Sequence, residues 1–592
     1  MHTPGQQIFT TWIVWMLIAA SLSAQPAVQT PQLQDPDSIL SHLLRSADFW
    51  KASIDSVDGG FYTEVNQDGT PERTDRKSFT QCSRHAYGFS RAFMVSGDTT
   101  YLHYADHALD FLYAHGWDSV HLGWFFSSDK YGTPSPPYGA GWNPNTTKWS
   151  FQQHYSVLGI GAMAEATRDP RHLAWFDRAA QVNDSLLWDS RPGYEGFYGT
   201  ANADWGNKRD KGFTPTVDGI TTWVLAKALL SDAPEDKARL LALADNIVDH
   251  LYASMSLPQV QFGFAEGYNA NWVVNTGNTG GSTGHVIKTA WCLARAYMID
   301  PKPIYREAAQ YMIDEMMFDG GYDYVNGGLF MGYNWATGVV EQKKDYWMLE
   351  QGVTSGLINY FLATDSADRE LNLGMADGCL GFFMEHMVDP VYGEIYSQTD
   401  PAGNVVNADK SDPFKGGYHN IELSYLTYVY GHLFLHEDSV SLYYHFAPAA
   451  SPRTFKMTPV AIRDDLLGIS RVQLDGAPYG AFDPQTRMLD IPAGVGGVFK
   501  VTYYLTGPFV AVRDQLSQHV RMYPNPANSH VQFRGLPSRA EVEIYGADGR
   551  LYATYAQVAD EMPLDVGALR PGLYLVQVRV GQQVWRQRLI RR

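Results

Sequence analysis

Cysteine is scarce in this 592-residue chain, and basic residues are outnumbered by acidic ones. The three cysteines, Cys82, Cys292 and Cys379, are too few and too scattered for a disulfide framework or a cysteine-based zinc site. Cys82 and Cys292 fall inside apolar helical patterns, so we expect buried thiols. Lys and Arg total 45 against 63 Asp and Glu, a net charge of −18. This balance argues against nucleic acids and anionic membranes as partners, because both favour clustered positive charge.

Long apolar runs are also missing, except at the N-terminus. Residues Ile8–Leu22 are mostly apolar, and the small residues that follow, up to Gln25, suit cleavage. The run is too short to span a bilayer comfortably, and nothing comparable follows it. We interpret residues 1–24 as a secretory signal peptide, although no Lys or Arg precedes the run, and residues 25–37 as a linker. No transmembrane helix is expected in the mature chain.

Aromatic residues are abundant, at 14% of the chain with 16 Trp and 36 Tyr. Flat apolar rings stack on the C–H faces of sugars, so this richness is common in carbohydrate-binding proteins, although a large helical core explains it equally well. With 45% hydrophobic residues, a chain of this length can build a large core and should hold more than one domain.

Residues 38–437 alternate amphipathic helical segments with short loops rich in aromatic residues and glycine. The spacing of apolar residues predicts roughly twelve helices. They begin near Ser38, Phe79, Tyr101, Lys148, Arg171, Thr216, Glu235, Gly284, Pro303, Lys344, Asp368 and Gly416. Between alternate helices, a tight turn followed by an aromatic run predicts a small β-hairpin. These loops are Asp58–Tyr62, Leu122–Phe126, Tyr194–Tyr198, Phe262–Ala265, Asn326–Phe330 and Tyr392–Tyr396.

A unit of two helices and one hairpin therefore recurs about six times, and no unit can bury its apolar face alone. Closing six helix pairs predicts a mainly α fold, an (α/α)6 barrel, in which the loops of one rim surround the centre. An open helical solenoid is the alternative.

A glycine-rich loop, Gly277–Gly284, runs directly into one of these helices. From Val286 on, apolar residues recur at helical spacing, so His285 lies in the first turn of a helix at the barrel rim. A helix N-terminus disfavours the imidazolium ion, which leaves such a histidine able to take up a proton near pH 7. A surface or capping histidine is the alternative reading.

Beyond about Glu437 the apolar pattern changes to a period of two. Val440–Phe446, Arg487–Ile491 and Val498–Leu505 are predicted strands, divided by Pro and Gly turns. They define a small β module over residues 438–515. Further strands at Val531–Phe533, Glu541–Tyr545 and Gly572–Val578 predict a C-terminal β-sandwich over residues 519–592.

The last seventy or so residues resemble the C-terminal sorting domain recognised by the type IX secretion system. The resemblance is carried by Tyr523-Pro-Asn-Pro526, the turn Ile544–Arg550, the segment Leu569–Tyr574 and the basic end Arg586–Arg592. It implies that the type IX machinery exports the protein across the outer membrane, and that the domain is then lost or serves as an anchor. The location would be extracellular or at the cell surface. A small carbohydrate-binding or adhesion sandwich is the alternative.

The helical region is similar to the N-acylglucosamine 2-epimerase superfamily, which includes cellobiose 2-epimerase and aldose-ketose isomerases. The motifs are Arg84–Ser90 followed by Gly97-Asp98, Lys148–Tyr155, Thr283–Lys288 with Trp291, Lys415–His419 and, more loosely, Lys344–Glu350. The resemblance implies that His285 and His419 flank a sugar and exchange the proton at its C2. Three polar positions depart from the family pattern, because Lys288 replaces a glutamate, a histidine is replaced near Asp218, and Glu422 replaces an arginine. These departures put the usual substrate, and the reaction itself, in question.

Histidines suit this chemistry because both their acid and their base forms are available near neutral pH. Return of the proton to C2 would invert that carbon, and return to C1 would give a ketose. Arg84 is the candidate to stabilise the negative charge of the enediolate. Further residues expected to bind substrate are Tyr87, Lys288, Trp347 and Glu350, although Lys288 could be a solvated rim residue and Tyr87 and Trp347 could be core aromatics. The sequence suggests no metal and no organic cofactor.

Two other functions remain open at this stage. A glycoside hydrolase on the same barrel would need two carboxylates across the centre, for which Asp218, Glu350 and Glu422 are the candidates. A secreted carbohydrate-binding protein could keep the barrel without catalysis.

Overall fold

The computed structural model describes residues 28–137, 142–275, 280–507, 521–523, 527–536, 539–546, 550–570, 572–580 and 583–591. The predicted signal peptide lies outside these ranges. Within them, no helix combines the length and the apolar character that a membrane crossing requires.

Six helical segments form an inner ring. They are α4 (Phe79–Ser96), α6 (Ser150–Thr167), the continuous segment η7 (Thr214–Asp218), η8 (Ile220–Val224) and α8 (Leu225–Ser231), α10 (Thr283–Ile299), α12 (Tyr346–Leu362) and α14 (His419–Tyr430). Each packs against the next in chain order, and α14 packs against α4, so the ring closes. The expected α/α barrel is confirmed, and the open solenoid is excluded.

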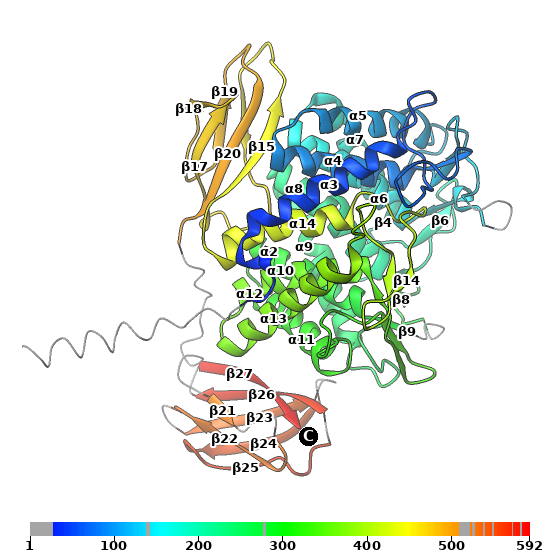
Figure 1. Ribbon diagram of the computed structural model, residues 1–592. Coiled ribbons are helices and arrows are strands. Elements are labelled where there is room, and N and C mark those ends of the chain that lie inside the picture. The colour runs from blue at the N-terminus through cyan, green and yellow to red at the C-terminus, as the bar shows by residue number, and fades with distance from the viewer. Residues whose placement is uncertain are drawn as a thin grey trace, which may run out of the picture.

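Six more helices pack outside the ring (Figure 1). They are α3 (Leu40–Trp50), α5 (Thr100–Phe111), α7 (Pro170–Val182), α9 (Pro234–Asn246), α11 (Pro303–Phe318) and α13 (Ser366–Phe382). The inner and outer helices differ in how their apolar residues are distributed around the helix. An inner helix such as α6 is buried on nearly every side, whereas an outer helix such as α7 is amphipathic and buries one face.

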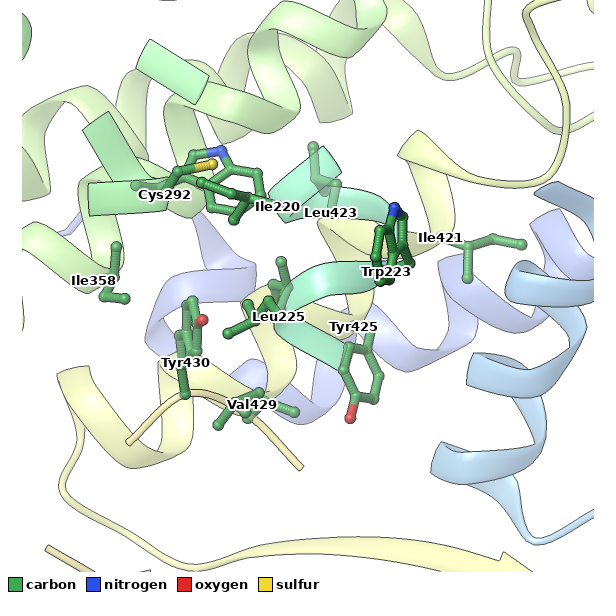
Figure 2. Packing of buried hydrophobic residues seen from close by; sticks show 14 of the residues in the cluster. Ile220, Trp223, Leu225, Cys292, Ile358, Ile421, Leu423, Tyr425, Val429 and Tyr430 are labelled. Carbon is green, nitrogen blue, oxygen red and sulfur yellow. The ribbon is translucent and has the colours of Figure 1, made fainter. Parts of the chain in front are cut away.

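Apolar side chains fill the interior between the inner helices. Figure 2 labels Ile220, Trp223, Leu225, Cys292, Ile358, Ile421, Leu423, Tyr425, Val429 and Tyr430, which come from η8, α8, α10, α12 and α14. Ile358, Val429 and Tyr430 lie near the C-terminal ends of their helices, so apolar packing fills that end of the barrel. All three cysteines are free and buried, as expected for Cys82 and Cys292.

Short strands connect the units around the rim where the inner helices begin. The strands β1 (Arg76–Ser78), β3 (Thr147–Trp149), β7 (Lys211–Gly212), β9 (Gly280–Ser282) and β12 (Lys344–Asp345) each precede an inner helix. They pair with β2 (Ser127–Asp129), β6 (Thr200–Asn202), β8 (Gly267–Tyr268), β10 (Gly332–Asn334) and β13 (Gln398–Thr399) of the following unit. Because each pair joins consecutive units, the starts of the inner helices are held at fixed positions around one rim.

A buried Asp–Lys ion pair recurs in five of the six units. The pairs are Asp55–Lys77, Asp118–Lys148, Asp189–Lys211, Asp323–Lys344 and Asp389–Lys410, with N–O distances between 2.7 and 2.9 Å. In the pair Asp323–Lys344, the other aspartate oxygen accepts backbone N–H groups of the hairpin turn, and the lysine also donates to the carbonyl of Gly327. Four of the five pairs therefore tie a hairpin to the strand before an inner helix, and the pair of Lys410 ties a hairpin to the segment between β14 (Val405–Asn407) and α14.

Replacing Lys344 by methionine should destabilise the barrel by about 3–5 kcal/mol, because it leaves a buried carboxylate without its cation. The control is Lys227→Met, which removes a pair with the largely exposed Asp177 and should cost less than about 1 kcal/mol. Denaturant unfolding would measure both. Equal effects of the two variants would contradict the structural role assigned to the buried pairs.

In the described residues of the fourth unit no such ion pair is found, and one sequence prediction is wrong there. Gly281 takes the position of the lysine, where a Cβ atom would lie 2.5 Å from the carbonyl oxygen of Phe262. The expected hairpin at Phe262–Ala265 contains no strand. Instead, Ser254 accepts the N–H of Ala265, and Glu315 accepts the N–H of Gly263. The other five loops form the expected β pairings.

Two β units follow the barrel. The first contains β15 (Val440–Phe446), β16 (Arg453–Lys456), β17 (Leu467–Leu474), β18 (Ala477–Tyr479), β19 (Met488–Ile491) and β20 (Gly497–Leu505). Its larger sheet has the order β15-β20-β17-β18, and β15 packs on α4 and α6, so this module shares the barrel core.

The second unit has its own apolar core. One of its sheets has the order β21-β22-β25, with β21 (Arg521–Tyr523), β22 (His530–Arg534) and β25 (Leu564–Asp565). The other has the order β24-β23-β26-β27, with β24 (Leu551–Val558), β23 (Ala540–Gly546), β26 (Gly572–Val580) and β27 (Gln583–Arg591). The chain thus carries a small all-β unit with a separate core after the barrel.

Candidate active site

His285 lies in the first turn of α10, as predicted. The side chain of Ser282 caps the helix and accepts the backbone N–H of His285 at 3.4 Å. The imidazole Nδ1 lies 2.9 Å from Oε1 of Glu266, and the ring of Phe213 stacks on the imidazole with a centroid distance of 3.8 Å. The side chain is 28% exposed. A carboxylate on one side and a flat ring on the other therefore fix the orientation of an accessible imidazole.

His419 is the first residue of α14 and is nearly buried. Its Nδ1 lies 3.3 Å from Oε2 of Glu350. Burial, together with the charges of Arg84 and Lys288, holds the pKa of His419 well below its usual range. This histidine is therefore neutral at physiological pH.

Trp347 lies near both histidines. Its ring centroid is 5.3 Å from that of His285 and 6.4 Å from that of His419, and the indole is partly exposed. Two imidazoles from separate helix starts therefore border the same aromatic surface. Trp347 offers an apolar ring on which a sugar could stack.

Arg84 of α4 is buried against aromatic rings. Its guanidinium lies 4.3 Å from the ring centroid of Tyr155 and 5.6 Å from that of Tyr418. In the described part of the chain, its buried Nε has no hydrogen-bond partner and no carboxylate forms an ion pair with it. A fixed cation without a counter-charge is well suited to stabilise an anion that forms during a reaction.

Lys288 is not a solvated rim residue, because it is buried in an ion pair. Its Nζ donates to Oδ1 of Asp218 at 2.6 Å and to the hydroxyl of Tyr155 at 3.2 Å. Burial alone would lower the pKa of Lys288, but the charge of Asp218 outweighs it and raises the pKa. Two of the three positions that were expected to depart from the family pattern thus form an ion pair with each other. Asp218 ends the π-helical segment η7, a type of helix that is frequent at functional sites.

Two further acids lie behind His419. Glu350 is completely buried, and Glu422 accepts a hydrogen bond from the hydroxyl group of Tyr87 at 3.1 Å. Burial, followed by the nearby charge of Glu422, holds the pKa of Glu350 well above its usual range. Neither Tyr87 nor Glu350 reaches an exposed surface, so the expected contact of each with a substrate stays a prediction.

Among the described residues, one group of side chains could hold a metal ion. Glu350, His419 and Glu422 each offer one ligand atom, and these atoms lie within 4.8 Å of one another. A histidine with two carboxylates suits a divalent cation. The nearby cations Arg84 and Lys288 oppose one.

Several site residues were not identified from the sequence. Glu266 and Phe213 contact His285, and Tyr155 contacts both Lys288 and Arg84. Phe213 and Tyr155 stand at or near the starts of predicted inner helices, and this position could have identified them. Glu266 follows the loop whose hairpin prediction was wrong, and no motif marked it.

The family models match two parts of the chain. Residues 60–422 match the family described as N-acylglucosamine 2-epimerase (GlcNAc 2-epimerase). Residues 521–592 match the secretion system C-terminal sorting domain, which indicates export and either secretion or attachment to the cell surface.

Known proteins of this type are distant in sequence. D-mannose isomerase of Marinomonas mediterranea is 20% identical over 67% of this chain and 97% of its own length. Cellobiose 2-epimerase of Bacteroides fragilis is 22% identical over 63% and 93%, respectively. The solved structure of cellobiose 2-epimerase from Spirochaeta thermophila has a TM-score of 0.59 at 21% identity, covering 69% of this chain and all of that one.

That structure supports the fold, and the family model spans more than half of the chain, including both histidines and all three divergent positions. The chain therefore belongs to the N-acylglucosamine 2-epimerase family.

Proposed function

We propose that this protein is an exported sugar 2-epimerase that acts on a reducing sugar by proton transfer between His285, His419 and C2. The observation that carries the proposal is the position of the two imidazoles, which come from different helix starts and whose ring centroids lie 5.3 and 6.4 Å from that of Trp347. A carbon atom held between two imidazoles can lose a proton to one and gain a proton from the other.

The reaction begins with the open-chain aldehyde form of the sugar. One histidine removes the C2 proton, the C–H electron pair forms a C1–C2 double bond, and the carbonyl electrons move to O1. Arg84 stabilises the resulting enediolate. The electrons then return, and C2 takes a proton on its opposite face from the second histidine. The carbon is inverted, and no cofactor is needed for the balance of atoms.

Aldose-ketose isomerisation is the second candidate. It needs the same enediolate, but the proton returns to C1. D-mannose isomerase of Marinomonas mediterranea is similar to this chain over nearly all of its own length, which keeps this outcome open. Removal of the proton by one imidazole and its return by a second one would favour inversion at C2.

The other two hypotheses are less well supported. Glycosidases place their two carboxyl groups about 5–5.5 Å apart or about 6.5–9.5 Å apart across an accessible substrate. Here Glu350 and Glu422 are buried and offer ligand atoms within 4.8 Å of one another, while Asp218 is neutralised by Lys288. A binding protein without catalysis would not need two oriented imidazoles.

We also propose a route by which the protein is exported. The sorting domain would form a small β-sandwich that the type IX machinery recognises after the N-terminal signal has directed the chain across the inner membrane. The substrate would then be a sugar found outside the cell.

The decisive test is proton exchange in deuterated water. Incubation with D-mannose, D-glucose or cellobiose should place deuterium at C2 of the product, as detected by NMR, because the proton lost from C2 equilibrates with solvent. Deuterium at C1 of a ketose would favour the isomerase. Release of reducing ends from a glycan without deuterium uptake would favour the hydrolase. Sugar binding without either reaction would favour the binding protein.

A further inference from the structure

We propose that Glu266 is a positioning residue for the transfer of the C2 proton, because it holds His285 with a free lone pair on Nε2. This inference rests on the proposed function, in which His285 exchanges that proton with the sugar. Glu266 would not touch the sugar and would act through the imidazole that it orients.

The hydrogen bonds at Glu266 set the direction of its contact with His285. The backbone N–H of Ser282 donates to Oε1 of Glu266 at 3.2 Å. Nδ1 of His285 lies 2.9 Å from the same oxygen. Because a backbone N–H can only donate, Oε1 is already an acceptor, and a carboxyl oxygen that accepts has room for a second hydrogen bond. Nδ1 therefore carries the hydrogen of this contact, and Nε2 of the neutral imidazole keeps its lone pair.

The backbone of Glu266 positions the second neighbour of His285. Its carbonyl accepts the N–H of Phe213 at 2.9 Å, and the Phe213 ring stacks on the imidazole with 24° between the two planes. Gly212 allows this approach, because its φ is +133° and a Cβ atom there would lie 2.0 Å from the carbonyl oxygen of Glu266. One residue thus fixes both the ring against the face of the imidazole and the hydrogen bond at its edge.

The fourth unit departs from the repeat at this same place. Where other units have the buried Asp–Lys pair, Gly281 takes the position of the lysine, and Glu266 accepts the N–H of the next residue, Ser282. Another carboxyl group holds the loop, since Glu315 accepts the N–H of Gly263 at 2.8 Å. Departures from a regular pattern are expected at functional sites. In this unit, a carboxyl group that also reaches a histidine takes the place of a purely structural ion pair.

The orientation of the imidazole decides whether His285 can act as a base. Without an acceptor at Nδ1, the ring could carry its hydrogen on Nε2 or turn about its side-chain bond, and Nε2 would then offer no lone pair to the C2 proton. With Nδ1 donating to Glu266, Nε2 takes the proton from C2 while the C–H electron pair forms the C1–C2 double bond. In the reverse direction Nε2 returns it. A third group that orients a base in this way is a recurrent arrangement in acid–base catalysis.

Glu266→Leu and Glu266→Gln test this role as a pair. Leucine is close to glutamate in size but cannot accept a hydrogen bond, so kcat should fall about 10- to 100-fold, the loss expected from a misplaced catalytic group. KM should stay within about threefold, because Glu266 does not contact the sugar. Glutamine keeps an acceptor oxygen for Ser282 and for Nδ1, and should hold kcat within about fivefold of the wild-type value.

Nitrogen-15 NMR of protein labelled at histidine reads the tautomer directly. The His285 signals are those that are absent from His285→Gln, and at a pH where the imidazole is neutral they should show hydrogen on Nδ1. Glu266→Gln should give the same pattern, whereas Glu266→Leu should move the population toward hydrogen on Nε2. A role limited to holding the loop would leave the tautomer unchanged.

Glu315→Leu is the matched control. It removes a carboxyl group that holds the same loop through the N–H of Gly263, but it leaves the contact between Glu266 and His285 in place. The hydrogen should stay on Nδ1, and kcat should stay within about threefold of the wild-type value, because the bond that orients the base is kept.

Three results would overturn the proposal. These are hydrogen on Nε2 of His285 in the wild-type protein, an unchanged kcat in Glu266→Leu, and equal effects of Glu266→Leu and Glu315→Leu on kcat and tautomer. The last would mean that Glu266 only holds the loop. If the wild-type protein exchanged no proton with any sugar, the proposed function would fail, whereas the NMR measurement would still decide whether Glu266 sets the tautomer of His285.

Discussion

Replacing His419 by alanine should abolish epimerisation while the barrel stays folded. General acid–base catalysis by one side chain contributes about 100- to 10,000-fold, so kcat should fall by that range. The histidine is the first residue of α14 and packs against the rings of Tyr418 and Tyr346, so its loss should lower the stability at one helix end without removing the helix. Product analysis by NMR and thermal unfolding would measure the two effects separately.

Isotope exchange can separate the removal of the C2 proton from the inversion of C2 in this variant. If His285 is the base, the variant should still remove and return the C2 proton on one face, so deuterium should enter the unreacted sugar without inversion. His386→Ala is a control for the loss of a histidine, because His386 lies on the π-helical turn that follows α13, outside the site. Full epimerase activity in the His419 variant would remove this residue from the mechanism.

The helical framework could be predicted because its signals are local. Apolar periodicity and capping residues place the helix starts within a few residues of their observed positions, as for α4 and α10. The position of His285 at a helix start was predicted from the local pattern, and its pairing with His419 was predicted by resemblance. The hairpin at Phe262–Ala265 failed because the described residues of its unit do not form the Asp–Lys pair that holds the other hairpins, a repeated pattern that was visible in the sequence but was not recognised.

The chemistry around the histidines could not be predicted because it depends on contacts between distant segments. Lys288 and Asp218 are 70 positions apart, and Glu350 and His419 are 69 positions apart. Nothing in the local pattern indicates that a lysine at a rim position will be buried in an ion pair. Asp218 and Lys288 form an ion pair because the closed ring packs η7 against α10.

The second large effect should come from Arg84→Met, which should lower kcat about 100- to 1,000-fold without a matching loss of stability. Removing one group that stabilises a developing oxyanion typically has an effect of this size. The buried guanidinium has a desolvation cost and gains mainly a cation–π contact with Tyr155, which is worth about 0.5–2 kcal/mol. Methionine avoids the desolvation cost, so the free energy of unfolding should fall by no more than about 1 kcal/mol.

Arg91 offers the matched control on the same helix. It is also buried, but it forms an ion pair with Glu165 at 2.8 Å. Arg91→Met would leave Glu165 without its cation and should destabilise the protein by about 3–5 kcal/mol. The two arginines of α4 should therefore separate catalysis from stability, because the unpaired one serves the reaction and the paired one serves the fold. Comparable losses of stability in both variants would mean that Arg84 has a structural partner and is not free to stabilise the enediolate.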